Sequence, residues 1–253
     1  MKFSANLGLL WPEIPQIDKI YRAKEAGFDA IEFQFPYDND ATEIRKAIDD
    51  VELPVIGINT LKGNIENGDF GLNAVPSKIR EAQEAINLAV EYATIIGAQN
   101  IHCMGGITEL NPKSLITFID NLKYARDLLK DSDIKLLIEP KNQIDNPGYF
   151  LTKVEQARDI CELVGKDYLK IMYDFYHIQI NQGDVLRKFE NNIDFIGHIQ
   201  IASVPKRNEP IYGELNYKII IPEIYNLGYS GFIGAEYNPL NSTDNGLSWL
   251  KGF

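Results

Sequence analysis

Short apolar runs recur along the chain, and stretches with a helical pattern of apolar and polar positions separate them. The run Leu136–Ile138 is continuous rather than alternating, which is typical of a strand buried on both faces. Glu139 and Pro140 then end it. Residues 2–7 alternate between apolar and polar positions, and together with further apolar runs they predict eight strands, at residues 2–7, 28–35, 54–59, 100–104, 136–138, 169–174, 195–201 and 232–236.

Between most of these runs, apolar residues recur at spacings of three and four, as on the buried face of a helix. The predicted helices cover residues 16–26, 42–48, 77–96, 112–129, 152–165, 217–227 and 242–250. Alternating strands and helices indicate a parallel sheet with right-handed crossovers. Eight units in 253 residues predict a single (β/α)₈ TIM barrel, with residues 1–253 forming one domain. An open doubly wound sheet is the main rival, but the sequence has no glycine-rich phosphate loop after an early strand.

Residues 60–76 have no clear period and are rich in glycine and asparagine. Loops of this length without secondary structure are uncommon in compact domains and are often functional. We therefore expect a lid over a binding site, with a plain surface loop as the alternative.

The composition excludes several classes of protein. The formal net charge is −11 and no block of lysine and arginine is present, so nucleic acid is not an expected partner. Two cysteines, Cys103 and Cys161, argue against a disulfide framework and fit a reducing compartment. No segment has the length of a membrane span, and residues 1–11 lack the features of a signal peptide. We expect a cytoplasmic protein, and the sequence leaves both a monomer and a homo-oligomer open.

Each of the last four predicted strands ends in an oxygen-bearing side chain: Glu139, Asp174, Gln200 and Glu236. In a barrel, the carboxyl ends of the strands meet at one rim, where catalytic residues lie. Two like charges 4 Å apart repel by about 4 kcal/mol at an effective dielectric of 20, so such a cluster takes up protons or binds a cation. Oxygen ligands select a hard ion such as Mg²⁺ or Mn²⁺. The alternative is that each carboxylate forms its own salt bridge or helix cap.

Several other residues are weaker candidates. His177 lies three residues after the sixth strand's aspartate and is either a site residue or a structural histidine. His198 points to the same face of its strand as Gln200 and is expected to support the site, while His102 could line the pocket or pack in the core. Arg207 could clamp a substrate carboxylate or hydroxyl, or be a solvated loop charge. Glu32 also lies near the carboxyl end of a predicted strand. A role in positioning other groups of the site is the less favoured interpretation of this residue.

A set of motifs occurs in order along nearly the whole chain: Phe3–Leu7, Glu32-Phe33 with Phe35–Tyr37, Ile138–Pro140, Tyr173-Asp174 with His177, His198–Ala202, Arg207 with Glu209-Pro210, Gly213-Glu214 with Asn216-Tyr217, and Glu236-Tyr237. This ordered set resembles the hydroxypyruvate isomerase family, within the xylose-isomerase-like barrels. The resemblance implies a divalent metal ion held by Glu139, Asp174, Gln200 and Glu236. It also implies that Glu139 and Glu236 are the acid/base pair and that His177 and Arg207 contact the substrate.

The chain departs from this family in two ways. Asn238 stands where the family usually has lysine, which removes a cation beside Glu236. The segment 59–76, together with His102, looks closer to the related 2-oxo-tetronate isomerases, whereas residues 139–142 and 173–177 look closer to hydroxypyruvate isomerases.

The expected reaction moves a carbonyl one carbon along a small hydroxy-oxo acid, for example from hydroxypyruvate to tartronate semialdehyde, through a cis-enediolate that a metal ion would stabilise. A 2-oxo-tetronate isomerase is the first alternative. A ketose 3-epimerase is less favoured because such enzymes normally have histidine where Gln200 stands. A zinc-dependent DNA-repair nuclease would need many histidines and a basic surface, and a non-catalytic scaffold is the remaining alternative.

Overall fold

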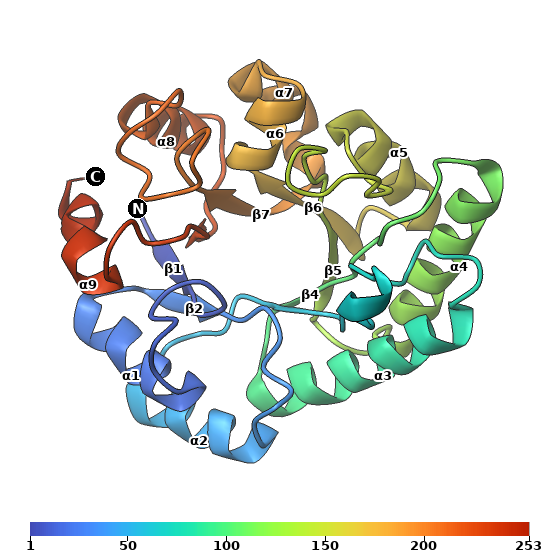
Figure 1. The fold of residues 1–253 in the computed structure, drawn as a ribbon, viewed down its shortest axis with the longest axis horizontal. Coiled ribbons are helices and arrows are strands. Elements are labelled where there is room, and N and C mark those ends of the chain that lie inside the picture. Colours follow the sequence, from blue (N-terminus) through green and yellow to red (C-terminus); the bar gives the residue numbers. More distant parts are fainter. Residues whose placement is uncertain (253) are drawn as a thin grey trace.

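Eight parallel strands form the centre of the protein, whose computed structural model describes residues 1–252. The strands are β1 (Phe3–Asn6), β2 (Ala30–Glu32), β3 (Ile58–Asn59), β4 (Asn100–His102), β5 (Lys135–Ile138), β6 (Leu169–Asp174), β7 (Ile196–Ile201) and β8 (Ile233–Ala235). They are hydrogen-bonded in the order β2-β1-β8-β7-β6-β5-β4-β3, and helices surround them as a ring (Figure 1). The predicted (β/α)₈ barrel is confirmed.

Isolated β-bridges, rather than a continuous ladder of backbone hydrogen bonds, connect the segments of β2 and β3 and nearly close the barrel. The backbone N–H of Ile31 donates to the carbonyl of Pro54 at 3.0 Å, and that of Ile56 donates to the carbonyl of Ile31 at 2.8 Å. Val55 bridges to Ile31 on one side and Ala98 on the other. The third strand is therefore shorter than the predicted 54–59, although the whole predicted segment contributes to closure.

The helices are α1 (Gln16–Ala26), α2 (Ala41–Val51), α3 (Ile79–Ile96), α4 (Pro112–Leu128), α5 (Val154–Val164), α6 (Phe175–Asn181), α7 (Val185–Asn192), α8 (Tyr217–Asn226) and α9 (Thr243–Gly246), with 3₁₀ turns at Ile65–Asn67, Ile193–Phe195 and Leu247–Lys251. Helices α6 and α7 were not predicted. They occupy the crossover between β6 and β7, and each spans about two turns, too short to show a clear period in the sequence.

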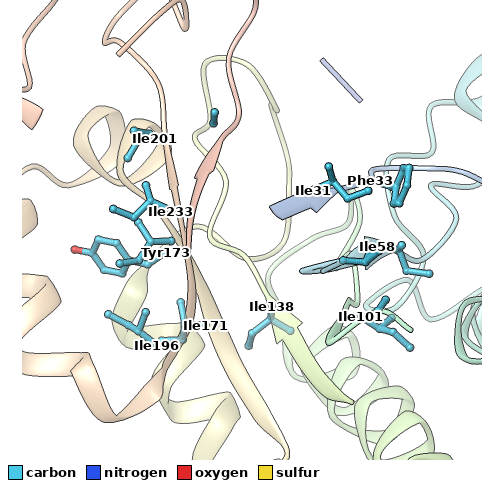
Figure 2. Packing of buried hydrophobic residues seen from close by; sticks show 14 of the residues in the cluster. Ile31, Phe33, Ile58, Ile101, Ile138, Ile171, Tyr173, Ile196, Ile201 and Ile233 are labelled. Carbon is cyan, nitrogen blue, oxygen red and sulfur yellow. The ribbon is translucent and has the colours of Figure 1, made fainter. Parts of the chain in front are cut away.

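The strands alternate between apolar residues that join the hydrophobic core and other residues on the opposite face. In β7, Ile199 and Ile201 belong to the core cluster, while His198 and Gln200 alternate with them in the sequence. Figure 2 shows isoleucines of several strands, together with Tyr173, packed in this buried layer. The opposite face lines the barrel, so the side chains at the strand ends that continue this alternation are directed into its interior.

The loop 60–76 is anchored at its base and exposed at its tip. The backbone N–H of Ala74 donates to the carbonyl of Gly105 at 2.7 Å, and that of Gly71 donates to the carbonyl of Lys62 at 2.8 Å. The tip contains the 3₁₀ turn Ile65–Asn67, whose residues are exposed. Its role as a lid stays a prediction.

Cys103 and Cys161 are free and buried, so neither forms a disulfide. Within residues 1–252, no helix is both long enough and apolar enough to span a lipid bilayer.

Candidate active site

The four predicted strand-end residues converge at the carboxyl rim of the barrel. Glu139 and Glu236 directly follow β5 and β8, Asp174 is the last residue of β6, and Gln200 lies in β7 opposite Asp174 in the strand register. All four are almost completely buried. The structure therefore places all four residues of the strand-end pattern at one rim, and their roles as ligands or catalysts stay a prediction.

His177 joins this cluster because Asp174 caps helix α6. The Asp174 carboxylate accepts the backbone N–H of Tyr176 at 2.8 Å, which starts the helix and turns the next residue toward the site. His177 Nε2 then lies 3.5 Å from Glu139 Oε1 and 3.6 Å from Asp174 Oδ2. Glu139, Asp174 and His177 are close enough together to hold a metal ion.

The hydrogen bonds around His177 fix which ring nitrogen carries the proton. The backbone N–H of Asn142 donates to Nδ1 at 3.2 Å, and the Asn142 side-chain amide lies 2.7 Å from the same atom. The amide orientation is itself set, because Asn142 Oδ1 accepts the backbone N–H groups of Ile144 and Asp145. Neutral His177 therefore carries its proton on Nε2, which makes it a hydrogen-bond donor facing the carboxylates and not a metal ligand.

Two cations oppose the carboxylates. Arg207 Nη2 lies 2.7 Å from Glu236 Oε2 and 3.8 Å from Asp174 Oδ2, and its guanidinium stacks on the Tyr176 ring at 5.1 Å. Lys141 forms a buried ion pair with Glu139. Arg207 was predicted to belong to the site, whereas Lys141 was not.

A further hydrogen-bonded set lies beneath this cluster. Glu32 contacts His198 Nε2 and accepts the Gln200 amide at 3.0 Å and the Asn6 amide at 3.0 Å. Burial alone would raise the pKa of Glu32, but the charge and hydrogen bond of His198 and the two amides outweigh it and lower that pKa. Glu32 therefore remains a carboxylate and fixes the orientation of Gln200.

The pKa values of Asp174 and Glu236, in the cluster above Glu32, shift in the opposite direction. Burial raises the pKa of Asp174 to about 8, with Arg207 opposing the rise and Glu236 and Glu139 adding to it. Burial also raises the pKa of Glu236, again against the charge of Arg207. Asp174 therefore holds a proton at neutral pH unless another positive charge enters the cluster, and the pKa of Glu236 is shifted in the same direction.

Several buried polar atoms of the cluster have no hydrogen-bond partner among the described residues: Glu139 Oε1, Asp174 Oδ2, Gln200 Oε1 and His177 Nε2. Buried acceptors are normally satisfied, so unpaired ones indicate a place for a ligand. Glu236 differs, because its Oε1 accepts amides of Asn6 and Gln34 and its Oε2 accepts Arg207.

The cluster opens toward a cavity of about 630 Å³ at the rim. Its lining includes Tyr176 and Arg207, the segment 145–147, and the tip of the 60–76 loop with Asp69 and Phe70. Lys206 and Asn238 also line this entrance. The loop predicted as a lid is thus placed at the entrance to the site.

Some site residues carry only weak signals in the sequence. Asn6, Gln34 and Asn142 each lie at or just beyond a strand end, so a search of all eight strand ends would have included them. Lys141 follows Glu139 by two residues, but lysines are mostly exposed and nothing local indicates its burial.

A family model described as the xylose isomerase-like TIM barrel matches residues 20–253. The chain belongs to this family. A 2-oxo-tetronate isomerase from Cupriavidus necator is 40% identical over 100% of this chain and 98% of its own length. Hydroxypyruvate isomerase from Escherichia coli is 37% identical over 100% of this chain and 99% of its own length. The resemblance inferred from the motifs is therefore confirmed.

Solved structures show the same architecture. The crystal structure of a Brucella melitensis protein described as a family 2 AP endonuclease is 37% identical and superimposes with a TM-score of 0.96, covering 100% of this chain and 98% of that one. A 3-keto-D-glucoside 4-epimerase from E. coli has a TM-score of 0.82 over 100% of both chains, but at 21% identity this likeness shows the fold alone.

Proposed function

We propose that this protein is a metal-dependent isomerase that moves a carbonyl one carbon along a small hydroxy-oxo acid. The substrate we favour is hydroxypyruvate, which would become 2-hydroxy-3-oxopropanoate (tartronate semialdehyde). The relatives named hydroxypyruvate isomerase and 2-oxo-tetronate isomerase support this class of reaction. The observation that carries the proposal is that two buried glutamates, Glu139 and Glu236, lie at the same rim of the barrel, with Asp174 and Arg207 beside them.

The residues present fit a divalent metal ion. The unpaired oxygens of Glu139, Asp174 and Gln200 would hold it, and Glu236 would join them if it released some of its present partners. An all-oxygen donor set favours Mg²⁺ or Mn²⁺. Such an ion, when bound, supplies Lewis acidity that stabilises negative charge on neighbouring substrate oxygens.

The reaction needs one proton to leave the hydroxyl-bearing carbon and one to reach the neighbouring carbon. The intermediate between these steps is a cis-enediolate, whose two oxygens also exchange a proton. Glu139 and Glu236 would act as the acid/base pair, since both are buried carboxyl groups at the same rim, and burial raises the pKa of Glu236. His177 would donate its Nε2–H to a substrate oxygen, and Arg207 would bind the substrate from the opposite wall.

A 2-oxo-tetronate isomerase is the second candidate, and the 40% identical Cupriavidus protein favours it. The chemistry of the two candidates is the same, and the substrates differ by one carbon unit beyond the reacting centre. The cavity at the rim has room for either acid.

The test is an assay of protein loaded with Mg²⁺ or Mn²⁺ on hydroxypyruvate and on 2-oxo-tetronates side by side, with solvent deuterium incorporation followed by NMR. Glu139→Gln and Glu236→Gln should each reduce turnover by about 10²- to 10⁴-fold. Glu209→Gln is the matched control, because this buried glutamate accepts the backbone N–H of Leu240 outside the cluster. Absence of both turnover and deuterium exchange with either acid would refute the proposal.

A further inference from the structure

Lys141 is a buried cation that the proposed chemistry does not use. Its backbone is held on both sides: its N–H donates to the carbonyl of Leu151 at 2.9 Å, and its carbonyl accepts the Asn181 amide at 3.0 Å. The residue is 7% exposed. The side chain is therefore directed into the site by backbone contacts that do not depend on its charge.

The Lys141 ammonium lies among the reacting groups. It forms an ion pair with Glu139 Oε2. Its charge also acts on Glu236, His102 and His177, which surround the cluster. A cation that reaches both members of the acid/base pair must also lie near a substrate bound between them.

A buried lysine is costly, because removing an ammonium from water outweighs the gain from one ion pair unless the geometry is favourable. One explanation for burying Lys141 is that it only neutralises Glu139. The total charge of the cluster indicates another explanation, that Lys141 also binds a charged group of the substrate.

The cluster contains three carboxyl groups, of Glu139, Asp174 and Glu236, and two permanent cations near them, Lys141 and Arg207. When these three carboxyl groups are ionised and a divalent ion is bound, the five side chains and the ion sum to one excess positive charge, with the Glu32 carboxylate, which is paired with His198 beneath them, counted separately. A neutral sugar would leave this charge unbalanced, whereas a substrate with one carboxylate would neutralise it.

We propose that Lys141 is a specificity-determining residue whose ammonium binds the substrate's carboxylate and so selects small oxo-acids over neutral ketoses of the same size. The inference rests on the proposed function for the class of reaction, but not for the identity of the acid. Lys141 would exchange part of its contact with Glu139 for the substrate carboxylate, which leaves Glu139 more basic in the complex.

The experiment compares the wild type, Lys141→Met and Lys141→Arg in binding and in turnover. Binding of oxamate, an unreactive monoanion, and of hydroxyacetone, a neutral ketone, is measured by calorimetry in the presence of Mg²⁺. Turnover is measured with hydroxypyruvate and with dihydroxyacetone, in which a hydroxymethyl group replaces the carboxylate. Lys188→Met is the control. Lys188 forms an ion pair with Glu155, with 2.8 Å between Lys188 Nζ and Glu155 Oε1, and this pair lies outside the site.

We expect Lys141→Met to weaken oxamate binding by about 10- to 100-fold, the range of a hydrogen bond between charged groups, and to leave hydroxyacetone binding within about twofold. The ratio of kcat/KM for hydroxypyruvate to that for dihydroxyacetone should fall by the same factor. Lys141→Arg should keep most of this preference, and Lys188→Met should keep all of it. A melting curve for each variant confirms that it is folded.

Equal losses for the anionic and neutral ligands, or no loss for either, would overturn the inference. A role limited to Glu139 would show as tighter Mn²⁺ binding in Lys141→Met with unchanged oxamate affinity, and this result also overturns it. If wild-type protein binds oxamate through Lys141 but isomerises no acid, the proposed function fails and the inference stands. If it isomerises hydroxypyruvate and Lys141→Met keeps its preference for acids, only the inference fails.

Discussion

Asp174→Asn should change how the stability of the metal-free protein depends on pH. Asp174 is completely buried, and its Oδ2 has no hydrogen-bond partner among the described residues. Burial raises its pKa to about 8, although the nearby Arg207 opposes the rise, while a carboxyl of this kind in an unfolded chain has a pKa of 3.8. Asparagine keeps the shape of the side chain and removes the titrating group.

The sign follows from which state holds the proton. Between pH 3.8 and about 8, folded Asp174 stays protonated while the unfolded chain has released its proton, so the contribution of Asp174 to stability is lost as the pH rises through this range. The slope is about 1.4 kcal/mol per pH unit. From pH 6.5 to about 8 the loss amounts to about 2 kcal/mol, and the contribution of Glu236, whose pKa burial also raises, has the same sign. Below pH 6.5, His102 and His177 act in the opposite direction, because burial lowers their pKa values.

The assay is urea unfolding with a metal chelator, followed by circular dichroism at several pH values from about 6.5 to 8. The wild type should lose stability across this range, and Asp174→Asn should lose about 2 kcal/mol less. Asp131→Asn, at an exposed position, should behave like the wild type. Parallel profiles for the wild type and Asp174→Asn would refute the reasoning, since they would mean that this carboxyl is ionised in the folded protein.

Three other predictions concern the metal, its support and the entrance loop. Adding Mg²⁺ or Mn²⁺ at about one hundred times its Kd should stabilise the wild type by about 2.7 kcal/mol and Asp174→Asn by much less in thermal unfolding, and no stabilisation of the wild type would contradict the metal proposal. Glu32→Gln removes the carboxylate that holds the Gln200 amide and should weaken Mn²⁺ binding by about 10- to 100-fold in a paramagnetic-resonance titration, so an unchanged affinity would count against a supporting role. Gly71→Ala should lower the free energy of unfolding by about 1–3 kcal/mol, because Gly71 has φ +103° and its Cβ would meet backbone at 2.8 Å. Gly68→Ala, with φ +84° but open space around it, should cost less in the same urea titration, and equal costs would show that the close approach is unimportant.

The barrel could be predicted because the pattern of apolar strands and amphipathic helices that produces it recurs along the sequence. Most units have an apolar strand followed by an amphipathic helix, and eight such strands in 253 residues leave few other arrangements. The site could be predicted in part for the same reason, since parallel strands bring Glu139, Asp174, Gln200 and Glu236 to one rim. The missed α6 and α7 lie in one crossover, where the helices are too short for periodicity to separate them from the preceding strand.

The remaining site residues depend on contacts between distant segments. Glu32 appeared a minor candidate because its partner His198 lies 166 positions away in sequence. Lys141 gave no signal, because its burial follows from backbone contacts with Leu151 and Asn181. A sequence pattern reports what each strand end carries, but the pairing of charges across the rim is decided by loops of irregular structure.

The fold does not decide the chemistry, and the donor atoms of the site do. A protein described as an AP endonuclease shares this fold with a TM-score of 0.96, so architecture alone does not separate a nuclease from an isomerase. In this chain the proton on His177 Nε2 removes that nitrogen from the possible ligands, so the metal ion proposed above would be held by oxygens of Glu139, Asp174 and Gln200, a donor set that suits Mg²⁺ or Mn²⁺ better than zinc. A net charge of −11 also opposes binding to a phosphate backbone. Oxygen donors, two buried cations and a small cavity together favour proton transfer on a small acid, which is why the tautomer of one histidine bears on the whole assignment.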